Sequence, residues 1–133
     1  MHPLEKLFFE LTRKMKFQGL LLKESLQNLE VLKLIKIIKQ EKWEIPKERL
    51  ADFQPKIWTA ITFEGDIKKI EEISQKMSKA IKPKWYLNIG TSDKEIVVFH
   101  KKIFEHKKED KEEKEKVKEY GKSIGIPKCQ MDY

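Results

Sequence analysis

Three histidines and one cysteine are the side chains that could bind a transition metal or act as a nucleophile. They are His2, His100, His106 and Cys129. A zinc site needs three or four ligands at short, regular spacing, and the sequence contains neither a CxxC nor an HExxH motif. His100 and His106 lie six residues apart across an expected turn, so their rings could approach each other. We nevertheless predict no metal site and expect exposed surface histidines.

Cofactor and catalytic motifs are also absent from the sequence. Nucleotide phosphates are usually bound by glycine-rich loops before a helix, and this chain has only five glycines and neither GxGxxG nor GxxxxGK[ST]. It has no serine in a nucleophile-elbow context. We therefore predict no cofactor and favour a protein without enzymatic activity. A non-local active site near His100, His106 and the C-terminal tail is the weakest alternative.

Aromatic residues and lysines give a candidate binding surface. Trp58, Trp85, Tyr86, Phe99 and Phe104 fall on neighbouring predicted strands, whose side chains alternate between two faces, so some rings must point away from the helices. Such rings, with lysines nearby, could stack nucleic-acid bases. We favour the alternative that the amphipathic N-terminal helix covers this face, because that helix needs an apolar surface. The candidate binding residues are Trp58, Trp85, Tyr86, His100, Lys101 and Lys102.

The charge pattern argues against a dedicated nucleic-acid interface. The 133 residues carry a net charge of +7, but the excess is spread along the chain and only Arg13 and Arg49 are arginines. Nucleic-acid-binding proteins usually gather their charge on one face and use arginine for bidentate contacts. The single cysteine fits a reducing compartment, and no apolar run reaches the ~18 residues of a membrane span. We expect a cytoplasmic protein that does not enter the membrane.

The N-terminal part of the sequence predicts helices. In residues 3–17, apolar residues recur at the spacing of one helical face, and Gly19 is a plausible stop signal. Residues 24–34 are ambiguous and favour a short second helix. We therefore treat residues 1–34 as a helical segment that precedes the sheet.

The rest of the chain alternates between strands and helices. In 57–64, IWTAITFE, the residues Ile57, Ile61 and Phe63 share one face and Trp58 lies on the other. The stripe over 67–81 is that of an amphipathic helix. Predicted strands cover 35–45, 57–64, 85–89, 95–99 and 103–105, and predicted helices lie near 67–81 and 108–124.

These elements predict an α+β fold. We expect a largely antiparallel sheet of four or five strands, packed by helices, in a single domain over residues 1–133. Residues 35–133 form the sheet core of this prediction. The tail after residue 124 is expected to pack back on the sheet through Ile126 and Met131.

Three segments of the second half carry a family resemblance. They are IWTAITFEG (57–65), WYLNIGTSDKEIVVFHKKIFEH (85–106) and YGKSIGIPKCQMDY (120–133). Together they resemble an uncharacterised family of small bacterial proteins, which end in a Y-G-x-S-x-G-[IV]-P-x-x-Q-[LM]-D-aromatic tail. The resemblance implies a bacterial domain with an integral C-terminal tail, and it implies no activity or ligand. Lys101-Lys102 departs from the family, where a glycine-containing turn is expected.

The sequence thus favours a non-catalytic binding or protein-interaction module. Its partner would be another protein, and an exposed edge strand after the hairpins would be a natural docking element. The alternative is a nucleic-acid-binding module that uses the aromatic residues and lysines of the sheet face. A concave pocket, an aromatic-lysine face or a flat apolar patch would distinguish the enzyme, nucleic-acid and protein-binding hypotheses.

Overall fold

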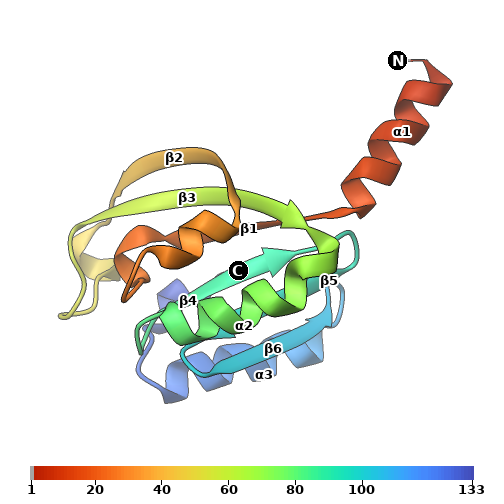
Figure 1. Cartoon of the computed structure of the whole chain (residues 1–133). Coiled ribbons are helices and arrows are strands. Elements are labelled where there is room, and N and C mark those ends of the chain that lie inside the picture. Colours follow the sequence, from red (N-terminus) through yellow and green to blue (C-terminus); the bar gives the residue numbers. More distant parts are fainter. Residues whose placement is uncertain (1) are drawn as a thin grey trace.

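Strand-forming segments that lie far apart in the sequence assemble into one antiparallel sheet in the computed structural model, which describes residues 2–133 (Figure 1). Within these residues the sheet has six strands in the order β2-β3-β1-β4-β5-β6, and every neighbouring pair is antiparallel. The strands are β1 (Lys16–Leu22), β2 (Lys36–Glu44), β3 (Ile57–Asp66), β4 (Tyr86–Gly90), β5 (Lys94–Phe99) and β6 (Lys102–Lys107). The described α-helices are α1 (Pro3–Lys14), α2 (Ile70–Ala80) and α3 (Lys111–Ser123).

The antiparallel α+β class agrees with the sequence prediction, but the strand count of four or five is wrong. The missed strand is β1, whose residues the sequence predicts as the end of the first helix and its stop signal. β1 lies near the middle of the sheet between β3 and β4. The prediction of helical structure is therefore wrong for residues 16–22, and residues 24–34 contain short 3₁₀ turns in place of a second α-helix.

Glycine and aromatic residues explain why the segment 16–22 forms a strand. Phe17 lies opposite Gly65 of β3, and Gly19 lies opposite Phe63, so each aromatic ring covers a glycine on the neighbouring strand. A Cβ atom at Gly19 would overlap the ring of Phe63. This packing of rings on glycines depends on β3, which lies nearly fifty residues further along the chain. No pattern within residues 16–22 alone indicates it.

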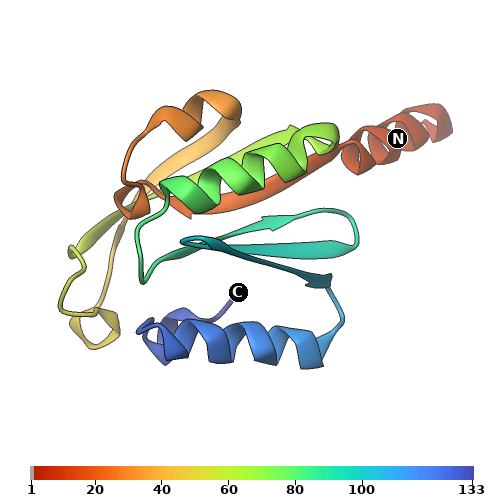
Figure 2. The same cartoon turned by 60° about the horizontal axis from the view of Figure 1, so that its bottom comes forward.

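One face of the sheet is covered by α2 (Figure 2). Apolar side chains of β1, β3, β4 and β5 point to this face in register, and they pack against Ile73 and Met77 of α2. These sheet residues are Phe17, Leu21, Ile61, Phe63, Leu87, Ile89, Ile96 and Val98. The predicted alternation of β3 is confirmed, and the helix predicted over 67–81 is present as the shorter α2, with a 3₁₀ turn at Ile67–Lys69 before it.

The opposite face is covered over only half of its width. Helix α3 and the C-terminal tail pack on β4, β5 and β6, where Val97 and Phe99 contact Val117 in a second buried cluster. Ile126 and Met131 of the tail belong to this cluster, as the sequence predicted. The other half, made by β1, β2 and β3, has no helix over it (Figure 2). We call these two parts the sealed half and the open half.

Helix α1 does not cover the open half, contrary to the sequence expectation. It projects from the start of β1 away from the sheet (Figures 1 and 2). Met15 is the single residue between α1 and β1, and its carbonyl oxygen accepts a hydrogen bond from the backbone N–H of Ile67 at 2.9 Å. The junction between the helix and the sheet is therefore a single residue, whose carbonyl group is held by a backbone hydrogen bond.

Candidate functional site

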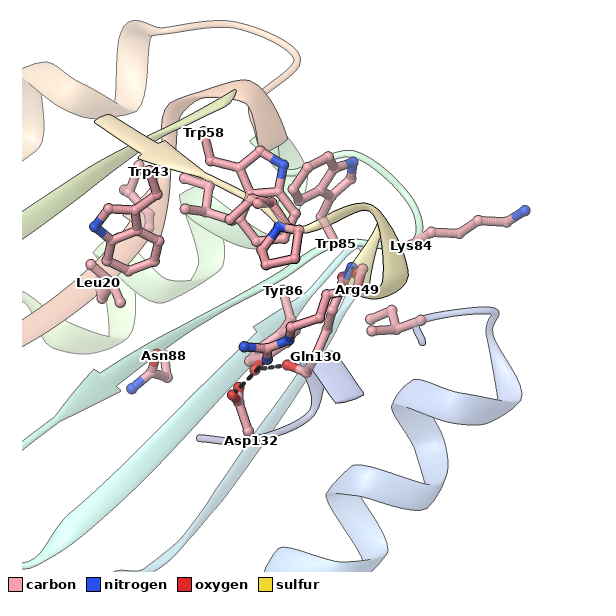
Figure 3. A pocket seen from close by; sticks show the side chains of 15 residues that line it. Leu20, Trp43, Arg49, Trp58, Lys84, Trp85, Tyr86, Asn88, Gln130 and Asp132 are labelled. Carbon is pink, nitrogen blue, oxygen red and sulfur yellow. Dashed lines mark hydrogen bonds and ion pairs between the residues drawn. The ribbon is translucent and has the colours of Figure 1, made fainter. Parts of the chain in front are cut away.

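A cavity of about 200 Å³ lies at the end of the open half, next to the loop of residues 45–56 (Figure 3). Its walls are mostly apolar and come from five separate parts of the chain. Leu20 and Leu22 come from β1, Trp43 from β2, Trp58 from β3, and Trp85 and Tyr86 from the start of β4. All three tryptophans of the chain therefore line one cavity.

Strand register brings two of the tryptophans together. Trp43 of β2 is the direct cross-strand partner of Trp58 in β3, so both side chains lie on the open face. The ring of Trp58 then packs edge-on against Trp85, with 5.5 Å between the ring centroids. Trp58 is 8% exposed and Trp85 is 6% exposed, whereas Trp43 is partly exposed at the mouth. Trp58 and Trp85 therefore form a buried wall of the cavity, and Trp43 is the tryptophan that solvent can reach.

The indole of Trp58 is also held by a hydrogen bond. Its Nε1–H donates to the carbonyl oxygen of Pro55 at 2.9 Å. Phe53, from the same loop, packs edge-on against Trp85 at a centroid distance of 6.1 Å. The loop after β2 therefore supports the back of the aromatic wall.

Arg49 connects this loop to the C-terminal tail at the rim of the cavity. Its Nη2 donates to the carbonyl oxygen of Cys129 at 2.7 Å and to Oδ2 of Asp132 at 3.1 Å. The hydrogen bond to Asp132 contributes most to a pKa of Arg49 above its ordinary value. In return, Nε2 of Gln130 donates to the carbonyl oxygen of Arg49 at 2.7 Å. The Nε and Nη1 donors of Arg49 have no partner within residues 2–133.

Tyr86 forms part of the cavity wall as a neutral hydroxyl. Its hydroxyl group donates to the carbonyl oxygen of Gln130. Burial raises the pKa of Tyr86, and the nearby carboxylate of Asp132 raises it further. The phenol therefore stays protonated at neutral pH and cannot act as a base there.

The cavity continues into a more polar cleft along the open half. The two hollows share Leu20 and Asn88, and the cleft is bordered by Lys16, Glu64 and Lys108. The side-chain amide of Asn88 makes no hydrogen bond to the described part of the chain, and it lies where the two hollows meet. An occupant of the aromatic cavity would thus have a polar amide within reach at this border.

The structure brings together half of the predicted binding residues. Trp58, Trp85 and Tyr86 all line the cavity. His100, Lys101 and Lys102 do not, because they lie at the turn between β5 and β6. The backbone N–H of Lys101 donates to the carbonyl oxygen of Ser78 near the end of α2. Lys101 and Lys102 line a separate shallow cleft there, together with Lys79.

The two central histidines are also kept apart. Nδ1 of His100 lies 2.7 Å from the carbonyl oxygen of Ile81, after α2. His106 is at the other end of β6, and its Nε2 lies 2.9 Å from the hydroxyl of Tyr133. They therefore do not form one site, although their spacing allowed an approach across the turn. The expectation of exposed surface histidines is wrong for His106, which is 6% exposed. Among the described residues there is no group of three or more histidine, cysteine, aspartate or glutamate side chains that could hold a metal ion.

Sequence reasoning missed several residues of the cavity. Trp43 was placed on a predicted strand, but its pairing with Trp58 requires the register of β2 on β3. Arg49 is one of only two arginines in a lysine-rich chain, and Asp132 belongs to the tail motif. The rarity of arginine and the place of Asp132 in the tail motif mark these two residues, but neither signal indicates that they form an ion pair.

Within residues 2–133, no helix is both long enough and apolar enough to cross a membrane. Comparison of the chain with protein-family models, with curated proteins and with solved structures finds no match.

Proposed function

We propose that this protein is a non-catalytic binding module, and that its aromatic cavity takes a compact planar molecule with an acceptor oxygen. The observation that carries the proposal is the convergence of three tryptophans and Tyr86 on one partly open hollow. Ligand sites are typically concave and mostly apolar, with a few polar groups that orient the ligand.

The size of the cavity limits the ligand. An apolar protein cavity of about 150 Å³ accommodates benzene. A cavity of about 200 Å³ therefore suits a molecule of one or two fused rings. Aromatic walls favour a planar ring, because offset-stacked and edge-on contacts between rings are attractive beyond the burial of apolar area.

The rim favours a ligand that carries an acceptor oxygen. Nε and Nη1 of Arg49 and the amide of Asn88 are donors without a partner in the described chain, and both residues line the cavity. The one carboxylate of the lining, Asp132, is already paired with Arg49. A carboxylate or carbonyl group on the ligand would match the remaining donors.

The lining supports binding in preference to catalysis. It contains neither histidine nor cysteine, its only acid is held in an ion pair, and Tyr86 is held protonated. General acid–base or nucleophilic chemistry needs groups that titrate near the working pH or are activated by a base.

Stacking of nucleic-acid bases is less well supported. Trp58 and Trp85 are buried in the wall of a cavity of about 200 Å³, which has room for one or two fused rings but not for a run of stacked bases. The predicted lysines, Lys101 and Lys102, lie in a different cleft from the tryptophans.

The experiment is a titration followed by the three tryptophan Nε1–H signals in NMR spectra. Indole and indole-3-carboxylate are the probes. At about 0.5 kcal/mol per atom, the nine heavy atoms of indole give a dissociation constant of about 0.5 mM. We expect the carboxylate to bind several-fold more tightly. Absence of saturable shifts with both probes at 5 mM would overturn the proposal, and tighter binding of indole would overturn the acceptor-oxygen part.

Two variants test whether the probes occupy this cavity. Trp43→Ala removes the accessible wall, and we expect at least a tenfold loss of affinity for both probes. Ile57→Ala is the matched control, because Ile57 is a large exposed side chain one residue from Trp58 but outside the lining. Equal losses in the two variants would place the probes elsewhere.

A further inference from the structure

The apolar stripe of helix α1 is the largest exposed apolar feature outside the cavity. Leu4, Leu7, Phe8, Leu11 and Met15 are between 51% and 73% exposed, and the helix projects from the sheet (Figure 1). An isolated helix of twelve residues is marginal in water, and helices in proteins are stabilised mainly by packing of their apolar face. Because these side chains are more than half exposed, the stripe offers an apolar surface to which a partner can bind.

We propose that this partner is a second copy of the chain, and that two α1 helices pair in an antiparallel homodimer. The inference is independent of the proposed ligand. The chain's own open half does not supply the surface, because α1 projects away from the sheet and is joined to β1 by Met15 alone (Figures 1 and 2).

The spacing of the stripe favours another helix as the partner. Leu4, Phe8, Leu11 and Met15 follow each other at intervals of four, three and four residues, which are the d and a positions of a coiled coil. A second α1 presents the same stripe, so the contact is self-complementary under a two-fold axis.

Charge favours the antiparallel arrangement. Glu5 lies in the first turn of α1, and the sequence of its last turn contains Arg13 and Lys14. Antiparallel pairing places Glu5 of each helix near the positions of Arg13 and Lys14 in the other. A lipid surface fits less well, because membrane-surface helices carry mostly basic polar faces, whereas α1 also carries Glu5 and Glu10.

A second apolar patch extends the interface at the base of α1. Leu34, Ile37 and Ile38, at and before the start of β2, are between 39% and 48% exposed. The starts of β1 and β2 lie at the same end of the sheet, because Lys16 and Lys36 both form ion pairs with Glu64, at 3.2 and 3.7 Å. In an antiparallel pair, the N-terminus of the partner helix points toward this end.

The exposed apolar side chains supply a large part of the area that a stable dimer needs. At 25 cal/mol per Å², the 1.5–3 kcal/mol gained by fully burying one large apolar side chain corresponds to about 60–120 Å². Scaled by the exposed fraction of each side chain, the five residues of the stripe supply about 180–370 Å² per copy, and the eight residues of both patches about 260–520 Å². Specific interfaces bury about 800 Å² per partner, of which about 60% is apolar, so the two patches supply half or more of that apolar area.

The test is sedimentation equilibrium of the full chain between 1 and 500 µM. We expect the mass to rise from 16.0 kDa toward twice that value. Leu11→Asp should give a monomer over the whole range with unchanged tryptophan fluorescence, since the stripe lies outside the sheet core. Lys6→Asp, on the polar face of the same helix, is the control and should still dimerise.

Three results would overturn the proposal. One is a wild-type chain that stays at 16.0 kDa at 500 µM, and another is a Leu11→Asp variant that still dimerises. The third is a monomer that floats with anionic phosphatidylserine vesicles, which would identify a lipid surface as the partner of the stripe. Glu5→Lys tests the orientation, and a several-fold weaker dimer is expected for antiparallel helices, whereas an unchanged dimer would exclude that orientation.

Discussion

The two halves of the sheet face opposite α2 differ in what covers them. In the sealed half, Val97 and Phe99 of β5 are fully buried beneath α3 and the tail. In the open half, Leu20 and Thr62 occupy equivalent positions on β1 and β3, and both remain partly exposed. One continuous sheet therefore presents a core surface on one side of the β1–β4 seam and an uncovered, hollowed surface on the other.

The composition of the strands reflects this difference in coverage. β5 contains Ile-Val-Val-Phe without interruption, which is typical of a strand buried on both faces. β1 interrupts its apolar residues with Gln18 and Gly19. Strands covered on both faces contribute to stability, whereas a strand covered on one face leaves side chains free to contact a ligand.

The largest contrast should come from truncating one residue in each half. Phe99→Ala should lower the free energy of unfolding by about 3–5 kcal/mol, because it leaves a cavity under α3. Leu20→Ala should cost about 1 kcal/mol or less, since its side chain already contacts solvent. Urea unfolding followed by circular dichroism measures both. Similar costs for the two variants would contradict the division into a sealed and an open half.

The seam between the halves should resist any added side chain on β1. In Gly19→Ala, the new methyl group would overlap the Phe63 ring and lie 2.8 Å from the carbonyl oxygen of Asn88. We expect a loss of about 1–3 kcal/mol in the free energy of unfolding. Gly90→Ala is the control on β4, because its nearest neighbours are 3.8 Å away. If both variants unfold at the same urea concentration, the seam is not tightly packed.

Alkaline pH should weaken the border of the sealed half through Tyr86. Burial raises the pKa of this phenol in the folded state, so the folded chain holds its proton more tightly than the unfolded chain does. Stability from this group is complete below the ordinary tyrosine pKa of about 10 and decreases as the pH rises above it.

Tyr86→Phe isolates this effect from the titration of other groups. By about pH 11, we expect the wild type to have lost about 1 kcal/mol more than the variant, relative to pH 8. Urea unfolding of both proteins at the two pH values gives the comparison. Parallel losses would mean that Tyr86 titrates in the folded protein as it does in the unfolded chain.

The smallest effect is expected at the turn between β5 and β6, on the edge of the sealed half. Lys101 has a φ of 60°, in the left-handed region that favours glycine. Lys101→Gly should raise the free energy of unfolding by about 0.5 kcal/mol, because the relief of strain exceeds the extra entropy of the unfolded chain. Lys102→Gly, in strand β6, should lower it by a similar amount. In thermal melting, we expect Lys101→Gly to have a higher melting temperature than the wild type and Lys102→Gly a lower one.

Local patterns predicted most elements of this fold but only part of its site. The stripe of α2 and the alternation of β3 are complete within a dozen residues, so they could be interpreted from the sequence. Strand β1 could not be predicted in this way, because it depends on cross-strand pairing with β3, in which Phe17 lies opposite Gly65 and Gly19 lies opposite Phe63. The aromatic residue types of Trp58, Trp85 and Tyr86 identified them as candidates, but no local signal grouped them with Arg49.

The sequence by itself determined which side chains share a face in the elements that it predicts correctly, such as β3 and α2, and indicated that the tail packs on the sheet. Periodicity does this, because the geometry of a helix or strand is the same wherever it occurs. Only the tertiary structure decided that Trp43 meets Trp58, that Arg49 holds Asp132, and that α1 leaves the open half uncovered. Those outcomes depend on strand order, register and the exit angle of one helix, and all three are set by contacts between residues far apart in the chain.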